Sequence, residues 1–98
     1  MRSRTLAVYI LTNSRRTVLY VGVTNDLVRR LLQHRTGTGS RFAHRYQADR
    51  LVHVEFFGDA RFAIAREKQL KAGSRARKVA LIESGNPEWR DLRALYAP

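Results

Sequence analysis

Residues 19–34 place the strongest constraint on how this chain can fold. The stretch begins with a β-branched run that carries Tyr20 and Gly22, passes through a polar turn and continues as a helical pattern that includes Arg30 and His34. Because Arg30 and His34 are four residues apart, they share one face of that helix. A strand that supplies a tyrosine beside a helix that supplies a cation is one way to build a site for phosphate groups.

The length and charge of the chain narrow the classes of partner. Its 98 residues fit one domain, which we expect to span residues 1–98, and 44% hydrophobic content predicts a folded protein. Nineteen Lys and Arg residues against eight Asp and Glu give a formal net charge of +11. A positive field of this size favours a polyanionic partner, nucleic acid first and an anionic membrane surface second.

Several classes of protein are excluded or disfavoured by what the sequence lacks. It contains no cysteine, which excludes disulfides, thiol catalysis and cysteine-bound zinc. No apolar run approaches the roughly 18 residues that a membrane span needs, and the first residues lead into a strand-like segment rather than a signal-peptide core. We therefore expect a cytoplasmic protein without a membrane partner.

The first elements are predicted to be a β-hairpin. Residues 6–11 and 17–23 are rich in β-branched and aromatic side chains, and a polar loop separates them. If the loop is centred between Ser14 and Arg15, Tyr9 lies directly opposite Tyr20. Both phenols then share one patch of the sheet.

The helix that follows has recognisable ends and an apolar stripe. Thr24 or Asn25 is the expected cap, Asp26 suits the positive first turn, and Gly37 is the expected stop. The residues expected to face the core are Leu27, Leu31 and Leu32.

The rest of the chain predicts one more strand and three helices. A short basic turn is expected at residues 40–46, a strand with regular alternation at 51–57, and helices at 59–71 and about 75–83. Asn86 is expected to cap a last short helix, with Pro87 in its first turn. The predicted fold is α+β, a small three-stranded and mostly antiparallel sheet flanked by helices in the order β-β-α-β-α-α-α.

Three residue types in this pattern suit phosphodiester hydrolysis. The reaction needs a group that activates water, a cation for the charge on phosphate oxygens and usually a metal held by carboxylate; Tyr20, Arg30 and Glu67 supply these types. A tyrosine with a pKa of about 10 is a poor base at neutral pH unless a metal or cation lowers that pKa. One carboxylate is enough for Mg²⁺, which keeps most of its waters. His34 could hydrogen-bond the phosphate or protonate the leaving oxygen.

An ordered set of short motifs resembles the GIY-YIG nuclease superfamily. The set consists of residues 8–10, residues 20–22, Arg30 ten positions after Tyr20, His34, and residues 66–71. With the Asn-Pro-Glu-Trp run at 86–89, nearly the full chain is similar to the small stand-alone GIY-YIG proteins of bacteria.

The resemblance implies a three-stranded sheet flanked by helices and cleavage of DNA that depends on Mg²⁺ or Mn²⁺. It implies a catalytic set of Tyr20, Arg30, Tyr9 and His34, in which either tyrosine can be the base; we prefer Tyr20. Glu67 corresponds to the metal ligand, while Gly22 and Asn86 correspond to structural positions.

Two residues depart from the family pattern. Val8 stands where the name-giving motif of the family has glycine, and Val23 stands where some members have a lysine beside the tyrosine. The valine at position 23 removes a possible helper for deprotonating the phenol.

Each candidate also has an ordinary structural explanation. Tyr9 and Tyr20 can be half-buried strand aromatics, Arg30 and His34 can be surface residues, and Glu67 can pair with a lysine one turn later. Asn86 is explained by a helix cap. Glu55, an isolated acid on a strand, is a rival metal ligand.

Three functions are compatible with the sequence. The leading interpretation is a metal-dependent endonuclease that binds the DNA phosphate backbone, with a role in DNA repair or recombination. The second is a non-catalytic module that binds DNA or RNA. The third is a subunit whose basic surface docks an acidic protein; the sequence leaves a protein partner or a homodimer open.

Overall fold

A computed structural model describes residues 5–36 and 41–96 of the chain. Its elements, in chain order, are β1 (Leu6–Thr12), β2 (Leu19–Thr24), α1 (Leu27–Thr36), α2 (Arg41–Arg45), β3 (Arg50–Phe57), α3 (Ala60–Ala72), α4 (Arg75–Gly85) and α5 (Arg93–Tyr96). In the described ranges, no helix is long and apolar enough to cross a membrane. The expected stop of α1 at Gly37 lies outside the described residues.

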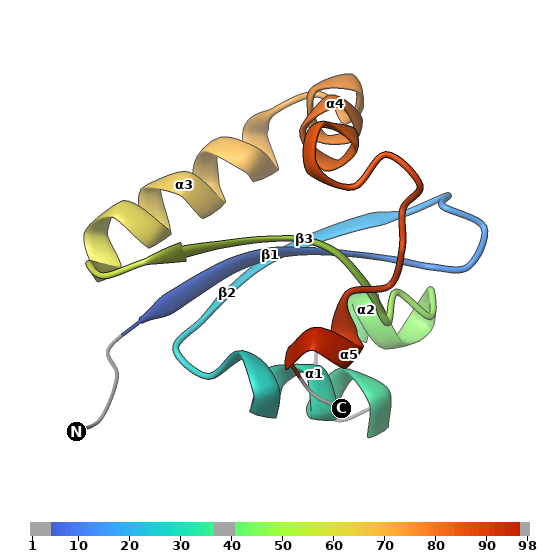
Figure 1. Cartoon of the computed structure of the whole chain (residues 1–98), viewed down its shortest axis with the longest axis horizontal. Coiled ribbons are helices and arrows are strands. Elements are labelled where there is room, and N and C mark those ends of the chain that lie inside the picture. Colours follow the sequence, from blue (N-terminus) through green and yellow to red (C-terminus); the bar gives the residue numbers. More distant parts are fainter. Residues whose placement is uncertain (1–4, 37–40, 97–98) are drawn as a thin grey trace.

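The three strands form one antiparallel sheet between two groups of helices. The strand order is β2-β1-β3, so β1 is central and β2 is an edge strand. Figure 1 shows α3 and α4 over one face, and α1, α2 and α5 over the other. The α+β class and the three-stranded antiparallel sheet are thus confirmed.

The central strand supplies the middle of both hydrophobic clusters. Tyr9 and Leu11 lie on the face of α1, α2 and α5, whereas Val8 and Ile10 lie on the face of α3 and α4. All four side chains are 0% exposed. Because successive residues of a strand point to opposite faces, a continuous apolar run is what a strand covered on both sides requires.

The predicted register of the β1–β2 hairpin was wrong by two residues. Tyr9 pairs with Gly22, and Tyr20 pairs with Leu11. The turn is centred later than expected, because the backbone oxygen of Asn13 accepts from the Arg16 amide at 3.0 Å and Arg16 has a positive φ of 57°. A slip of two residues keeps each side chain on its face, so both phenols still lie on the same side of the sheet.

The start and the buried stripe of α1 also differ from expectation. Asp26, rather than Thr24 or Asn25, caps the helix: its carboxylate accepts from the Arg29 amide at 3.1 Å. Leu32 is 41% exposed, and the buried stripe of the helix consists of Leu27, Leu31 and His34. A histidine therefore continues the apolar row of α1 into the protein.

A bulge interrupts the alternation predicted for the third strand. The register between β1 and β3 shifts between Ile10 and Leu11, which pair with His53 and Leu51, respectively. Val52 is the extra residue, and it is buried with the α3 and α4 cluster. The extra residue is an ordinary valine and not a glycine or proline. The alternation of side chains along the sequence therefore could not reveal the bulge.

Two expectations about short helices were wrong. Residues 41–45 form the helix α2 rather than a turn. Asn86 ends α4 instead of starting a helix, because its backbone amide donates to the Ile82 oxygen at 2.8 Å, and the last helix begins only at Arg93. The amide side chain of Asn86 clamps the following loop, donating to Val52 O at 3.2 Å and to Arg90 O at 2.9 Å.

Candidate active site

Tyr9 lies beneath the backbone of the neighbouring strand. Its ring passes under Gly22, its cross-strand partner. A Cβ atom added at Gly22 would fall on the Cζ and hydroxyl oxygen of Tyr9 and lie 2.9 Å from Cε2. Only a residue without a side chain leaves room for this phenol. Gly22, which the sequence assigned a structural position, therefore lets a fully buried ring extend toward the edge strand.

Tyr9, Tyr20 and His34 form a cluster of three rings. The ring centroids lie 6.3 Å apart for the two tyrosines, 6.2 Å for Tyr9 and His34, and 5.6 Å for Tyr20 and His34. The Tyr9 hydroxyl and His34 Nε2 are 3.4 Å apart. β1, β2 and α1 thus each contribute one ring to one place.

The surroundings of Tyr9 keep its phenol protonated. Burial raises the pKa of Tyr9 to about 12, and the nearby Tyr20 phenol adds to the increase. The charge of Glu67 also raises this pKa, whereas the Arg30 guanidinium lowers it. Tyr20, Arg30 and Glu67 therefore all affect the pKa of one hydroxyl group, that of Tyr9. At neutral pH Tyr9 is a hydrogen-bonding group and not a base.

His34 is buried and only partly hydrogen-bonded. The residue is 7% exposed, and its Nδ1 atom has no hydrogen-bond partner among the described residues. Burial lowers the pKa of His34, and the positive charge of Arg30 lowers it further. The imidazole is therefore neutral at pH 7.

This lowered pKa predicts a loss of stability in acid. The unfolded chain, with a histidine pKa of about 6.5, binds a proton more readily than buried His34. The free energy of unfolding should therefore hold above pH 6.5 and decrease as the pH falls toward the folded-state pKa of His34. Urea unfolding at several pH values measures this decrease. It should become smaller in His34→Gln and persist in the matched variant His44→Gln; equal decreases in both would contradict the assignment.

Glu67 approaches the cluster from the other face of the sheet. It lies on α3, its side chain is 15% exposed, and its carboxylate pairs with Lys71 at 2.8 Å. The predicted pair with a lysine one turn later is thus confirmed, and the charge of Glu67 also raises the pKa of Tyr9. α3 packs closely against the edge strand β2, which explains how a residue from this face reaches the site.

As a donor set for a divalent cation, the site offers one carboxylate. Among the described residues there is no group of three or more His, Cys, Asp and Glu side chains that could hold a metal ion. A single, partly exposed carboxylate fits Mg²⁺, because this ion keeps several waters and takes phosphate oxygens of the substrate as ligands. It does not fit an ion that requires a closed protein cage.

A hollow of about 230 Å³ lies beside Tyr20 at the edge of the sheet. Its lining includes Phe42 from α2, Lys71 from α3 and Lys78 from α4. Phe42 stacks on Tyr20 with centroids 6.1 Å apart and an interplanar angle of 25°. Sequence reasoning missed Phe42; the available signal was the pair of aromatics at positions 42 and 46, four apart in a basic segment.

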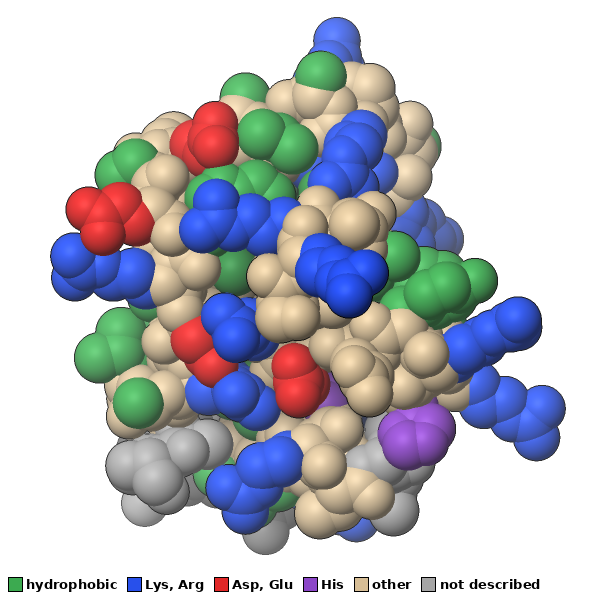
Figure 2. Space-filling model, turned by 90° about the vertical axis from the view of Figure 1, so that its right-hand side faces the viewer, with side chains coloured by type: hydrophobic (Ala, Val, Ile, Leu, Met, Phe, Trp, Pro, Cys, Tyr) green, Lys and Arg blue, Asp and Glu red, His purple; other side chains and the backbone are tan. Residues whose placement is uncertain are grey.

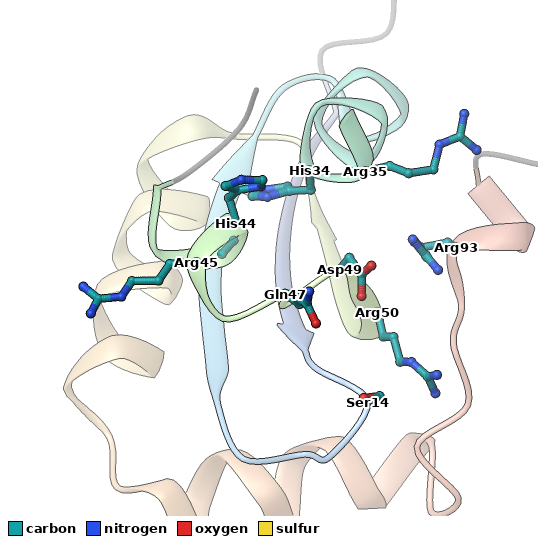
Figure 3. Close-up of a pocket in the computed structure, with 10 residues that line it drawn as sticks. Ser14, His34, Arg35, His44, Arg45, Gln47, Asp49, Arg50 and Arg93 are labelled. Carbon is teal, nitrogen blue, oxygen red and sulfur yellow. The ribbon is translucent and has the colours of Figure 1, made fainter. Parts of the chain in front are cut away.

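His34 also lines a second, larger hollow of about 540 Å³ between α1, α2, β3 and α5 (Figure 3). The arginines around it come from elements that are distant in sequence, namely Arg35, Arg45, Arg50 and Arg93, and Asp49 is the acidic residue of the lining. Figure 3 shows Arg35 and Arg45 extending outward on opposite sides. On the face in Figure 2, Lys and Arg side chains are dispersed, with fewer acidic ones among them. The four arginines give the hollow a predominantly positive lining.

The remaining sequence candidates lie outside the cluster. Glu55, the rival metal ligand, is engaged by Arg66 at 2.8 Å and by His53 at 2.7 Å, and these contacts lower its pKa. Val8 and Val23 are cross-strand partners in the hydrophobic cluster under α3 and α4. Their side chains belong to the sheet face opposite to Tyr9, so neither departure from the family pattern alters the ring cluster.

Comparison with known proteins adds three findings. The family model described as the GIY-YIG catalytic domain matches residues 6–80. The UPF0213 protein of Syntrophus aciditrophicus is 39% identical over 82 residues, covering 83% of this chain and 92% of that one, and the one from Haloquadratum walsbyi is 36% identical over 67 residues, covering 68% and 75%. The solution NMR structure of a UPF0213 protein from Bacillus halodurans aligns with a TM-score of 0.59 at 26% identity, covering 96% of this chain and 99% of that one.

Proposed function

Because this chain belongs to the GIY-YIG catalytic-domain family and to the UPF0213 proteins, we propose that it is an endonuclease that hydrolyses phosphodiester bonds of DNA. The observation that carries the proposal is the cluster of Tyr9, Tyr20 and His34, whose ring centroids lie 5.6–6.3 Å apart. The charges of Arg30 and Glu67 shift the pKa of the Tyr9 phenol in this cluster. We further propose one catalytic domain over residues 1–98 and a role in repair or recombination. Cytoplasmic location stays a prediction from the sequence.

The two tyrosines receive different roles in this proposal. Tyr20 first gives its own proton to solvent, and its phenolate then accepts the proton of the attacking water as the new bond to phosphorus forms. Tyr9 keeps its proton, because its pKa is about 12, and it holds the imidazole of His34, 3.4 Å away. The assignment is supported by exposure, since Tyr9 is fully buried while Tyr20 lines the open hollow at the sheet edge.

The other three residues of the site act on the phosphate group. Arg30 stabilises the negative charge that grows on the non-bridging oxygens. The neutral imidazole of His34 donates a hydrogen bond to the phosphate or to the leaving oxygen as its bond to phosphorus breaks. Glu67 would hold a divalent cation, Mg²⁺ or Mn²⁺; such an ion, when bound, neutralises phosphate charge and lowers the pKa of coordinated water.

Cleavage assays test the proposal directly. Pure protein is incubated with single-stranded, nicked, branched and duplex DNA, with Mg²⁺, with Mn²⁺ and with chelator. We expect cleavage of at least one substrate that requires a divalent ion and is lost in Glu67→Gln. Glu83→Gln on α4, whose carboxylate accepts from the Trp89 ring and lines neither hollow, serves as the matched control and should cleave normally. The absence of cleavage in every condition, or full cleavage by Glu67→Gln, would overturn the proposal.

The contact of Glu67 with Lys71 supports a second candidate function. A carboxylate neutralised by its own lysine at 2.8 Å also suits a module that binds DNA or RNA without cleaving it. This candidate predicts that Glu67→Gln binds nucleic acid as tightly as the wild type and that neither protein cleaves it. The same assays therefore separate the two functions.

Either function predicts a specific dependence of binding on salt. Arg35 and Arg50 are exposed at the larger hollow beside His34. If each neutralises one phosphate, replacing both by glutamine should make the slope of log K against log salt less steep by about 2. Affinity should fall by a similar factor for different sequences. Arg61→Gln, which removes a cation already paired with Asp59 at 2.9 Å, is the control; equal slopes in both variants would contradict the contact.

A further inference from the structure

The short helix α2 presents an exposed pair of aromatic rings. Phe42 and Tyr46 are 45% and 42% exposed, respectively, and their ring centroids lie 4.8 Å apart. Tyr46 directly follows the last helical residue, and its amide donates to the Phe42 oxygen at 3.1 Å, so the helical turn continues and both rings lie on the same side. Exposed aromatics that contact one another form an apolar surface whose faces can accept a further ring.

These two rings continue a series that begins inside the candidate site. Phe42 stacks on Tyr20 at 6.1 Å with an interplanar angle of 25°, and Tyr20 contacts the His34 ring at 5.6 Å. We call Tyr20, Phe42 and Tyr46 the aromatic ladder. Its rings contact one another in sequence from the proposed reactive phenol of Tyr20 to the exposed Tyr46. A ligand bound on Phe42 and Tyr46 would therefore lie beside the reacting group.

Positive charges border the ladder. Lys78 and Lys71, the latter paired with Glu67, line the 230 Å³ hollow together with Tyr20 and Phe42. No acidic side chain contributes to that lining among the described residues. The Arg45 guanidinium lies 5.7 Å from the ring centroid of Tyr46. Aromatic faces bordered by cations suit a polyanion that carries flat rings, which is the chemistry of an unpaired nucleic-acid strand.

We propose that Phe42 and Tyr46 are a stacking platform for unpaired bases of a nucleic-acid strand whose phosphate lies at Tyr20. The inference rests on the proposed function and deepens it, because it names the class of substrate: a strand with at least one unpaired nucleotide at the site. The faces of paired bases in a duplex are already stacked on their neighbours, and freeing one costs a few kcal/mol. The platform therefore selects single strands, flaps or frayed ends over intact duplex.

Binding without cleavage tests the platform. Fluorescence anisotropy is measured in chelator at one fixed salt concentration, with labelled single-stranded DNA, single-stranded RNA of the same sequence and the matching DNA duplex. Tyr46→Ala and Phe42→Ala should each weaken single-strand binding by roughly 5- to 150-fold, the loss that removal of one base–aromatic stack produces. Duplex affinity should change by less than about twofold. Phe62→Ala, which removes a 65% exposed aromatic from α3, should bind every ligand like the wild type.

Two further variants distinguish stacking from other contributions of the same side chain. Phe42→Trp should retain single-strand affinity, whereas Phe42→Leu, which is apolar but not aromatic, should lose it. Tyr46→Ala leaves the contact of Phe42 with Tyr20 intact. Its effect on binding therefore does not come from a displaced Tyr20 side chain. Thermal unfolding verifies that each variant is folded.

The outcomes separate this inference from the proposed function. Equal losses for DNA and RNA indicate recognition of the base faces alone, and a loss for one of them identifies the preferred strand; both support the platform. Normal single-strand binding by both alanine variants would overturn it, as would an equal loss of duplex binding, and the exposed rings would then fit a protein partner. Absence of cleavage beside the expected binding pattern would overturn the nuclease proposal and leave the platform standing.

Discussion

Replacement of Arg30 by alanine should lower the rate of phosphodiester cleavage by roughly 10²- to 10³-fold, the cost of losing one preorganised donor to a developing oxyanion. The guanidinium is half-buried on α1 and acts on both Tyr9 and His34. A charge in this position is already oriented when the substrate arrives, so its removal affects the chemical step more than binding. Single-turnover kinetics at saturating enzyme measure that step directly.

The neighbouring residue of the same helix provides the control. Arg29 is exposed on another face of α1, and Arg29→Ala should change the single-turnover rate by less than about threefold while removing the same net charge. Arg30→Lys retains the charge but not the planar fork of the guanidinium, and it should recover only part of the rate. Equal rates for Arg29→Ala and Arg30→Ala would show that the general positive field, and not the position of Arg30, is responsible.

The second large effect is expected on stability. In Gly22→Ala the added methyl group would fall on the ring of fully buried Tyr9, and neither the ring nor the paired strands can move without disturbing the core. Overpacking of this kind costs about 1–3 kcal/mol and occasionally more. A loss of 1 kcal/mol lowers the melting temperature of a domain of this size by roughly 4–8 °C. Calorimetry should therefore show a clear decrease.

Two comparisons isolate the contact from the general cost of replacing glycine. A Cβ atom at Gly58 or Gly85 meets no heavy atom within 4 Å, so Gly58→Ala and Gly85→Ala should be nearly neutral. In the double variant Gly22→Ala/Tyr9→Leu, the shorter side chain removes the collision, and the two effects should be less than additive. Full additivity would mean that the collision with Tyr9 is not the cause.

The elements that local patterns define were predicted well from the sequence. Two β-branched runs around a polar loop predicted the hairpin, and the helix predicted at residues 59–71 is α3, where the Asp59 carboxylate caps the start by accepting from the Arg61 amide. These features depend on neighbours within a few residues. The helix α2 was missed because a five-residue helix leaves no periodic pattern to detect.

Features set by tertiary contacts were not predictable in the same way. The bulge at Val52 depends on how β3 meets β1, and the role of Asn86 depends on a carbonyl 34 residues away. For the site, the spacing of Arg30 and His34 correctly placed both on one helix face. It could not reveal that the charge of Glu67, on α3, raises the pKa of Tyr9.

The fit between Tyr9 and Gly22 has a consequence for how the hairpin chooses its alignment. Gly22 is the only residue of β2 without a side chain, and the native pairing sets it across from the aromatic ring of β1. In the alignment shifted by two residues, Gly22 would face Ala7 and Tyr9 would face Tyr20, whose Cβ atom would take the space that the Tyr9 ring has under Gly22. The close fit between the Tyr9 ring and Gly22 thus favours the native register over the shifted one. The hairpin that pairs in this register also positions the two phenols of the site.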